Sequence, residues 1–379
     1  AMGGIAYGLR NGLHINAANP ASYSAVDSLT FLFDAGMSLQ NANFQEKGVK
    51  TNAKNSTIDY IAMQFRLWER MGMTLGFLPY STVGYNMSQT KTVSSDEYGN
   101  QISSLSTYSG DGGLQQVFAG LGFKVFKNLS IGANFSYFYG EINHSVKTIF
   151  NNTNANSSVR ADKIEISDYK LDLGMQYTQP FGKKHTVNLG LVYSLGHDLN
   201  GKGYNFKETY ASGVSYPMTQ TVDTIKNAFS LPHTLGIGAT YVYDRRLTVG
   251  VDYTLQKWED VEFFNEKGKF LNRTKISFGA EYLPNPISRN YLSRIRYRAG
   301  AYYSDPYTKV NGKESAREYG VSFGFGLPLE VFQSRSLLNI SGQYVKVSPK
   351  VKGMLEENYL RINLGLTFND RWFMKWKVE

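Results

Sequence analysis

The sequence predicts an all-β protein: a fourteen-stranded antiparallel transmembrane β-barrel with its N-terminal segment folded into the lumen as a hatch. Three observations support this fold. Apolar and polar residues alternate with period two almost from end to end. The alternating segments reach about ten residues, the span that a tilted strand needs to cross a bilayer. Long and short connections also alternate along the chain, as in up-and-down membrane barrels.

Composition agrees with one large closed sheet. The 379 residues show no linker or composition shift that would divide them into domains. Tyr (27), Phe (23) and Gly (37) are frequent while Pro (10) is scarce, which favours strands and tight turns over helices. Cysteine is absent, so disulfide frameworks, thiolate metal sites and Cys nucleophiles are excluded.

Charge and hydropathy narrow the class of partner. The net charge of +9 suits an anionic surface, and the basic residues are scattered without an arginine-rich run. We therefore expect contact with outer-membrane lipid and lipopolysaccharide, and no nucleic acid. The stretch 71–90 fails as a membrane helix because Pro79 and several glycines interrupt it. No signal peptide is visible at Ala1, and if one existed we expect that it was removed.

The strands follow from the alternation. In Leu247–Leu255 the odd positions are apolar or aromatic and the even ones small or polar, and 319–327 repeats this pattern. Residues 360–368 alternate in the same way, with the apolar residues at the even positions. One face then suits lipid and the other a wet lumen. We place the strands near 29–44, 56–68, 71–90, 114–126, 129–150, 159–180, 186–196, 233–243, 247–258, 273–283, 292–304, 316–328, 336–347 and 357–368.

The connections predict the topology. Those such as Glu69-Arg70, Lys127-Asn128 and 244–246 are short, as periplasmic turns are, and the connections between them are longer. We therefore expect the protein to lie in the outer membrane of a Gram-negative bacterium, with both termini on the periplasmic side. We divide the chain into a hatch (1–28), a barrel (29–368) that ends on the aromatic Phe368, and a basic periplasmic tail (369–379).

The N-terminal segment lacks alternation and consists largely of small, uncharged residues that suit a narrow lumen. Asn19, Pro20 and Ala21 form an Asn-Pro-Ala motif just ahead of the first strand. This motif, its position and the strand count resemble the FadL-type outer-membrane hydrophobic-compound transporter family. The resemblance implies that a hatch carrying the motif plugs a fourteen-stranded barrel. The closing segment 364–379 resembles the C-termini of Bacteroidetes-type members, although a basic tail departs from the usual aromatic ending.

Pro79, with Gly84 behind it, is the main irregularity in the predicted strands. Proline cannot donate to a strand ladder, so the third strand should bulge or kink there. In the family that the chain resembles, a kink in the third strand opens the wall sideways. The alternative is a bulge that only shapes the barrel.

The sequence shows no catalytic, metal or cofactor site. The histidines lack metal-ligand spacing, and there is neither a nucleophile elbow nor a phosphate loop. We therefore expect no cofactor and no enzymatic activity. The five histidines are His14, His144, His185, His197 and His233.

We expect passive uptake of hydrophobic, fatty-acid-like small molecules by lateral diffusion through the wall near Pro79. Entry of such a molecule into an apolar site gains on the order of 0.8 kcal/mol per CH₂. The long connection 197–232, together with the loop 91–113, is the candidate surface that captures the ligand. A disordered polar loop is the equal alternative for 197–232. Its aromatic candidates are Tyr204, Phe206, Tyr210 and Tyr216.

Two other functions stay open. A non-transporting barrel could scaffold a larger complex for outer-membrane protein secretion, insertion or lipoprotein handling, with other outer-membrane proteins or lipoproteins as partners. The basic tail, with Arg371, Lys375 and Lys377, could serve such contacts. An adhesin or phage receptor would need only the loops. A transporter requires a continuous apolar pocket and a gap near Pro79, whereas a scaffold requires a sealed wall and a large partner surface.

Overall fold

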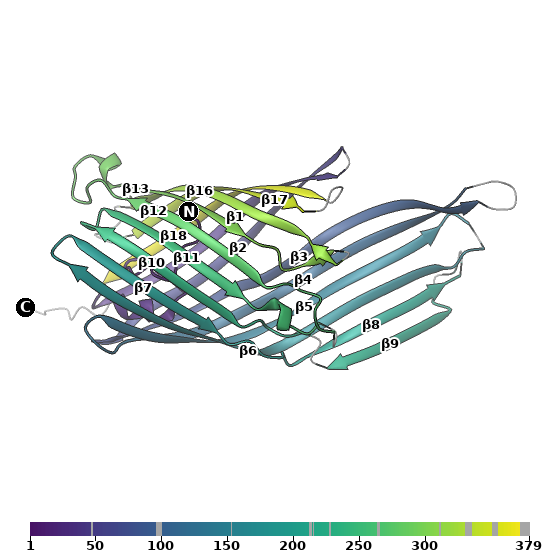
Figure 1. Ribbon diagram of the computed structural model, residues 1–379, viewed down its shortest axis with the longest axis horizontal. Coiled ribbons are helices and arrows are strands. Elements are labelled where there is room, and N and C mark those ends of the chain that lie inside the picture. The colour runs from purple at the N-terminus through teal and green to yellow at the C-terminus, as the bar shows by residue number, and fades with distance from the viewer. Residues whose placement is uncertain are drawn as a thin grey trace, which may run out of the picture.

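The computed structural model describes most of the chain as one long barrel of tilted strands (Figure 1). Described are residues 1–379 except 47, 96–100, 153, 212, 213, 215, 227, 228, 264, 265, 311, 330–335, 351–354 and 372–379. No helix within the described residues has the length and apolarity needed to span a membrane.

Within these described residues, the elements are strands and three short 3₁₀ helices. The helices are η1 (Pro20–Ala25), η2 (Trp258–Asp260) and η3 (Tyr291–Arg294). The strands are β1 (Thr30–Glu46), β2 (Val49–Trp68), β3 (Met71–Ser95), β4 (Gln101–Lys124), β5 (Leu129–Phe150), β6 (Ser157–Phe181), β7 (His185–Ser194), β8 (Gly201–Tyr210), β9 (Thr219–Lys226), β10 (Thr234–Tyr243), β11 (Leu247–Gln256), β12 (Arg273–Tyr282), β13 (Arg296–Ser304), β14 (Lys309–Val310), β15 (Lys313–Glu314), β16 (Ala316–Leu329), β17 (Ser336–Pro349) and β18 (Glu356–Arg371).

Fourteen of these strands close into an antiparallel barrel, which confirms the predicted fold class. They are β1–β7, β10–β13 and β16–β18, each paired with its barrel neighbours. The first and last strands pair from Thr30↔Arg371 to Gln45↔Glu356, and the β5–β6 pairing completes the ring. The start of β1 therefore lies beside the end of β18. We call this end of the barrel proximal and the opposite end distal.

Alternation along the strands places polar residues inside and apolar ones outside. On β11, Val251 and Tyr253 are each 40% exposed, while Asp252 between them is 3% exposed. A soluble sheet would bury the apolar pair and expose the carboxylate. The reversed order is that of a barrel whose outer face contacts lipid.

Several predicted loops at the distal end prove to be strand. β3 and β4 continue through most of the expected loop 91–113, and β2 begins at Val49 rather than near residue 56. These extensions consist largely of Ser, Thr, Asn and Gln, so they lack the apolar–polar contrast that marks a strand in a sequence. Cross-strand pairs such as Ser88–Thr107, 3.2 Å apart, hold them together instead.

The wall continues distally as an open sheet beyond the barrel (Figure 1). β6 pairs with β7 through residues 172–181 and with β8 through residues 157–166, and β8 then pairs with β9. The upper parts of β3–β6 together with β8 and β9 form a six-stranded sheet, which we call the distal sheet. β3 and β9 are its two edges.

The C-terminus differs slightly from expectation. β18 continues past Phe368 to Arg371, so the predicted strand-final aromatic lies inside the strand, paired with Phe33. The first three residues of the predicted tail are therefore strand. The rest, with Lys375 and Lys377, lies outside the described residues.

Candidate functional site: the lumen and a seam in the wall

The N-terminal segment, residues 1–29, lies against the inner wall, where η1 contacts β3, β4, β5 and β6. The Asn-Pro-Ala motif begins η1: the Asn19 side chain accepts a hydrogen bond from the Ala21 N–H (3.2 Å), and Pro20 occupies the first turn. Asn19 also donates to the carbonyls of Tyr7 (2.8 Å) and Met175 (3.3 Å), the latter on β6. All three motif residues are buried.

Glycines on the inner wall make this close approach possible. A Cβ at Gly132 would lie 2.4 Å from the carbonyl carbon of Pro20, and one at Gly174 would lie 2.2 Å from Asn19 Oδ1. Either contact is too short for a real side chain. The glycine content of the alternating strands therefore serves the packing of backbone against wall.

Buried polar side chains fix the segment in place. Asp252 of β11 accepts hydrogen bonds from the backbone N–H groups of Ala6 (2.5 Å) and Tyr7 (2.9 Å). Arg10 donates to Gln176 of β6 (3.1 Å) and to the Ala21 carbonyl (3.2 Å). Such charge-assisted bonds are stronger than neutral ones, so the segment is firmly attached.

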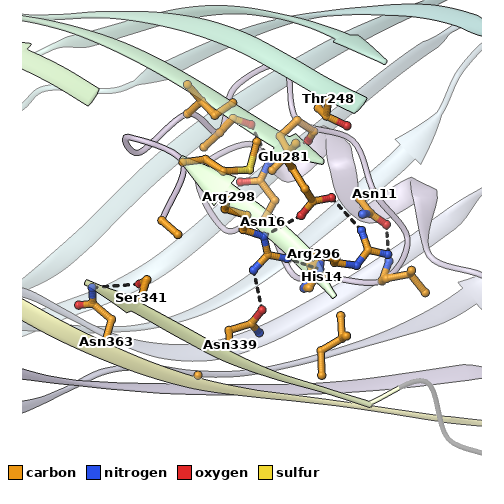
Figure 2. Close-up of a pocket in the computed structure, with 18 of the residues that line it drawn as sticks. Asn11, His14, Asn16, Thr248, Glu281, Arg296, Arg298, Asn339, Ser341 and Asn363 are labelled. Atoms are coloured by element: carbon orange, nitrogen blue, oxygen red, sulfur yellow. Dashed lines mark hydrogen bonds and ion pairs between the residues drawn. The ribbon is translucent and has the colours of Figure 1, made fainter. Parts of the chain in front are cut away.

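A polar cavity of about 1400 Å³ lies between the N-terminal segment and the wall, and Figure 2 shows part of it. The lining includes the turn residues Arg245 and Pro286 and also Pro328 near the proximal end of β16, which places the cavity toward the proximal end. Cations outnumber carboxylates in the lining. They are Arg10, Arg245, Lys275, Arg294, Arg296, Arg298 and Arg361, against Asp34, Asp59, Glu281 and Glu318.

One carboxylate in this cavity bridges two guanidinium groups (Figure 2). Glu281 of β12 accepts from Arg296 at 2.8 Å and from Arg298 at 2.7 Å, both on β13. Arg298 also donates to Asn339 (2.6 Å) and lies 3.4 Å from His14 Nε2. Burial, and then the charges of Arg298 and Arg296, lower the pKa of His14 to about 3, so the imidazole is neutral.

The wall has a seam between β2 and β3. These strands pair from Trp68↔Met71 to Ile61↔Phe77, and no described residue beyond Phe77 pairs with β2. Above that point β2 stays paired with β1, and β3 with β4. The free edges are residues 49–60 of β2 and 78–95 of β3.

Pro79 lies at the foot of this seam. β3 carries a bulge there, because its register with β4 shifts between Pro79 and Ser81. The intervening Tyr80 packs edge-to-face against the buried Phe138, with ring centroids 4.8 Å apart. Gly84 lies higher on the same free edge, and a Cβ there would meet no atom within 4 Å.

A second cavity, of about 480 Å³, lies at the same place. Tyr60 and Ala62, which flank the last paired residue of β2, line it together with Leu78, which follows the last paired residue of β3. Ile15, Ala17, Ala18 and Val192 add apolar surface. The polar lining is Tyr7, Asn16, Gln116, Ser194, Thr234 and the ion pair Lys170–Asp172.

Apolar side chains fill the lumen on the distal side of this cavity. They form a buried cluster of Leu114, Phe138, Ile164, Ile166, Leu199 and Leu231. Aromatic rings from the distal connections cover it. These rings, joined by centroid distances of 4.9–6.3 Å, are Phe229, Trp258, Phe263, Phe270 and Tyr307.

The predicted ligand-capturing residues lie elsewhere. Tyr204, Phe206 and Tyr210 belong to β8 rather than to a loop, and the neighbouring Gly203 is paired with the buried Ile164. By alternation, the three rings point away from the cluster that fills the lumen. Tyr216, beyond β8, is 73% exposed. The sequence interpretation missed the aromatic rings over the lumen, although the predicted strand 247–258 ends on one of them, Trp258.

The described residues hold no group of three or more His, Asp or Glu side chains that could bind a metal. His144 and His233 instead contact tyrosines: Tyr85 with His144 (2.9 Å) and Tyr193 with His233 (2.7 Å).

Comparison with known proteins gives a sequence family and a fold. The sequence model of the BamG family matches residues 1–379 of this chain. No curated protein matches the chain. The solved structures that resemble it include the CymD monoaromatic hydrocarbon channel, with 14% identity over 98% of this chain and 97% of that one, at a TM-score of 0.65.

Two further structures have the same fold. The Pseudomonas putida toluene transporter TodX is 16% identical over 98% of this chain and 96% of its own, at a TM-score of 0.60. A FadL homologue of Pseudomonas aeruginosa is 14% identical over 97% and 94%, at a TM-score of 0.58. At such identities the resemblance to FadL-type proteins is one of fold, that of an outer-membrane barrel, while the sequence family bears a different name. These comparisons do not support the Bacteroidetes-type assignment.

Proposed function

We propose that this chain, which belongs to the BamG family over its whole length, passes small hydrophobic molecules sideways through its wall. The proposal starts from its fold, which is that of outer-membrane channels. In this proposal the distal end is extracellular, the termini are periplasmic, and lipid and lipopolysaccharide surround the apolar outer face. The N-terminal segment is the hatch that closes the axial route.

The cavity at the seam is the observation that carries this proposal. Its volume of about 480 Å³ lies within the range of small-ligand sites, roughly 300–1,000 Å³. It lies where hydrogen bonding between β2 and β3 stops, so a ligand there adjoins an interrupted wall. An apolar molecule gains on the order of 0.8 kcal/mol per CH₂ on leaving water for an apolar site, and then passes into lipid without returning to water.

The axial route is unfavourable for the same molecule. Proximal to the seam lies the larger cavity, whose charged side chains offer an apolar ligand little. The hatch borders this cavity and is held in place by hydrogen bonds. Its backbone donates to Asp252 of the wall, and its Arg10 donates to Gln176 of the wall. Displacing it would leave the buried carboxylate of Asp252 and the half-buried guanidinium of Arg10 without partners, which costs several kcal/mol. The seam requires no such opening.

A disulfide across the foot of the seam tests the route. Tyr60 and Leu78 occupy the next pairing position beyond Ile61↔Phe77, so the double variant Tyr60→Cys/Leu78→Cys should crosslink the two edges. The native chain has no cysteine to interfere. Uptake of radiolabelled toluene by cells that carry the variant should fall about tenfold under oxidising conditions and recover on reduction.

The matched control is Met63→Cys/Leu75→Cys, which places a disulfide where the two strands already pair. It should leave uptake unchanged in both redox states. Equal uptake by the oxidised and reduced seam variant, with the disulfide verified by mass spectrometry, would refute passage through the seam.

A second function, a barrel subunit that holds other outer-membrane proteins or lipoproteins, is favoured by the distal sheet. β3, β4 and β6 have 24 or 25 residues each, far more than the roughly ten that cross a bilayer, so the distal sheet offers surface beyond the bilayer for contact with a partner. Native mass spectrometry after gentle extraction separates the two functions. A stoichiometric protein partner with an empty lumen supports the subunit, and a small apolar ligand without a partner supports the channel.

A further inference from the structure

The free edge of β3 is the longest unpaired backbone edge in the described part of the chain. β3 is hydrogen-bonded to β4 up to Ser95, yet its other side has no partner from Leu78 onward. Proteins usually shorten, bend or charge such edges because unpaired N–H and C=O groups invite another strand. Beyond the bulge at Pro79, β3 carries a single charge, Lys91.

The chemistry of an edge selects its ligand. Its alternating donors and acceptors repeat along the strand, and an extended polypeptide is the molecule that matches this repeat. Lipid tails offer no hydrogen bonds. β9, the other edge of the distal sheet, spans eight residues and carries charges of both signs, Asp223 and Lys226, so it is less suited to receive a strand.

The side chains of β3 define what such a strand should look like. Tyr85 and Met87 share one face, where Met87 is 53% exposed and Tyr85 stacks on His144 of β5. Asn86 and Ser88 point to the opposite face. A matching strand would place apolar residues beside Tyr85 and Met87 and polar residues on its other face.

Charge specifies the partner further. Residues 49–60 of β2 and 78–95 of β3, which border the seam, carry Lys50, Lys54 and Lys91 and one carboxylate, Asp59. Asp59 accepts a hydrogen bond from Ser38, so the three lysines outnumber a single carboxylate that already has a partner. An acidic strand would be attracted there. A second copy of β3 carries Lys91 and no carboxylate, so it offers these lysines no complementary charge.

We propose that the free edge of β3 binds an acidic, extended segment of another polypeptide by strand addition. This inference rests on the second function, the barrel subunit, and it specifies where the partner binds. It stands independently of the channel, because the strand would bind above Pro79, distal to the cavity at the foot of the seam.

Register-resolved crosslinking tests the proposal in cells. A photo-crosslinking amino acid is placed in turn at Asn86, Ser88 and Thr90, and the crosslinked peptides are sequenced by mass spectrometry. Strand addition predicts one partner segment, rich in Asp and Glu, in which the crosslinked residue moves by two for each step along β3. The same label at Lys147, on β5 within the distal sheet and paired on both sides, should not crosslink to that segment.

Two variants separate recognition from folding. Lys91→Glu should reduce crosslinking at Thr90 about fivefold, because it removes one exposed ion pair and adds repulsion between like charges. Lys147→Glu, on the neighbouring part of the sheet, should change it little. Both variants must retain the heat-resistant barrel on gels.

Three results would overturn the proposal. They are crosslinks to a second copy of this chain, crosslinks to lipid alone, and a partner whose crosslinked residues do not advance along the strand. A stoichiometric partner in native mass spectrometry that crosslinks only elsewhere would leave the subunit function intact and remove its assignment to β3.

Discussion

The barrel has two sides that are built differently. On one side, β10, β11 and β12 have ten residues each, β13 has nine, and each is paired along both edges. On the other, β2–β6 have 20–25 residues, and the wall parts between β2 and β3. The short side matches the roughly ten residues that cross a bilayer, and it holds the hatch through Asp252. The N-terminal segment is anchored on both sides, because η1 also packs against β3–β6, whereas the opening in the wall lies on the long side alone.

The largest expected effect comes from filling the space between hatch and wall. Gly132→Val should destabilise the barrel by about 3 kcal/mol, because its Cβ would collide with the Pro20 backbone. Gly84→Val is the matched change on the free edge, where a Cβ meets nothing, and should cost less than about 0.5 kcal/mol. Urea unfolding in lipid vesicles measures both, and equal losses would contradict the assignment of tight packing to the hatch alone.

Removing the anchor on the short side should have the next largest effect. Asp252→Ala leaves the N–H groups of Ala6 and Tyr7 without their acceptor, at a cost of about 2 kcal/mol. Hydrogen exchange within residues 1–29 should accelerate while exchange in the barrel strands stays slow. Asp223→Ala, in the exposed β9, should alter neither, and unchanged exchange in the Asp252 variant would show that the hatch is held elsewhere.

Acid should loosen the hatch on the same side. The folded pKa of His14 is about 3 while its unfolded value is about 6.5, so the unfolded form binds more protons between these values. The stabilisation is present above pH 6.5 and is lost as the pH falls toward 3. At pH 5.5 the equilibrium constant for opening of residues 1–29 should rise roughly tenfold over pH 7.5. In His14→Gln this pH dependence should flatten, and its persistence would assign it to another group.

The smallest effect is expected at the bulge on the long side. Tyr80→Leu removes the edge-to-face contact with Phe138 and should cost about 1 kcal/mol in urea unfolding. Phe123→Leu, at a 43% exposed outward position, should cost less. A larger loss at Phe123 would mean that the ring of Tyr80 does not stabilise the bulge.

The short side could be read from the sequence almost completely. Its strands alternate so regularly that the bounds of the predicted strands 247–258 and 273–283 agree with those of β11 and β12 to within two residues. The long side was harder, because the Ser- and Thr-rich upper strands carry no hydrophobic period and are defined by their partners. β8 and β9 fell within a predicted loop for the same reason.

The candidate site was visible only in part. The bulge at Pro79 could be predicted from that residue alone, because proline cannot donate a hydrogen bond to the neighbouring strand. The seam could not be predicted, because it depends on how β2 and β3 diverge in space beyond Ile61. No local sequence pattern indicates where two strands diverge. Arg296 and Arg298, two positions apart on one strand face, could have been recognised as inward charges, but their bridge through Glu281 required the register of β12 and β13.

The forked pairing of β6 has a consequence for how such barrels diversify. Its lower half pairs with β7 inside the ring, while its upper half carries the β8–β9 hairpin outside it. The hairpin therefore adds no member to the ring and leaves its circumference unchanged. Mutation could lengthen, exchange or delete the hairpin while the ring still closes. The hairpin and the ring are therefore free to evolve at different rates.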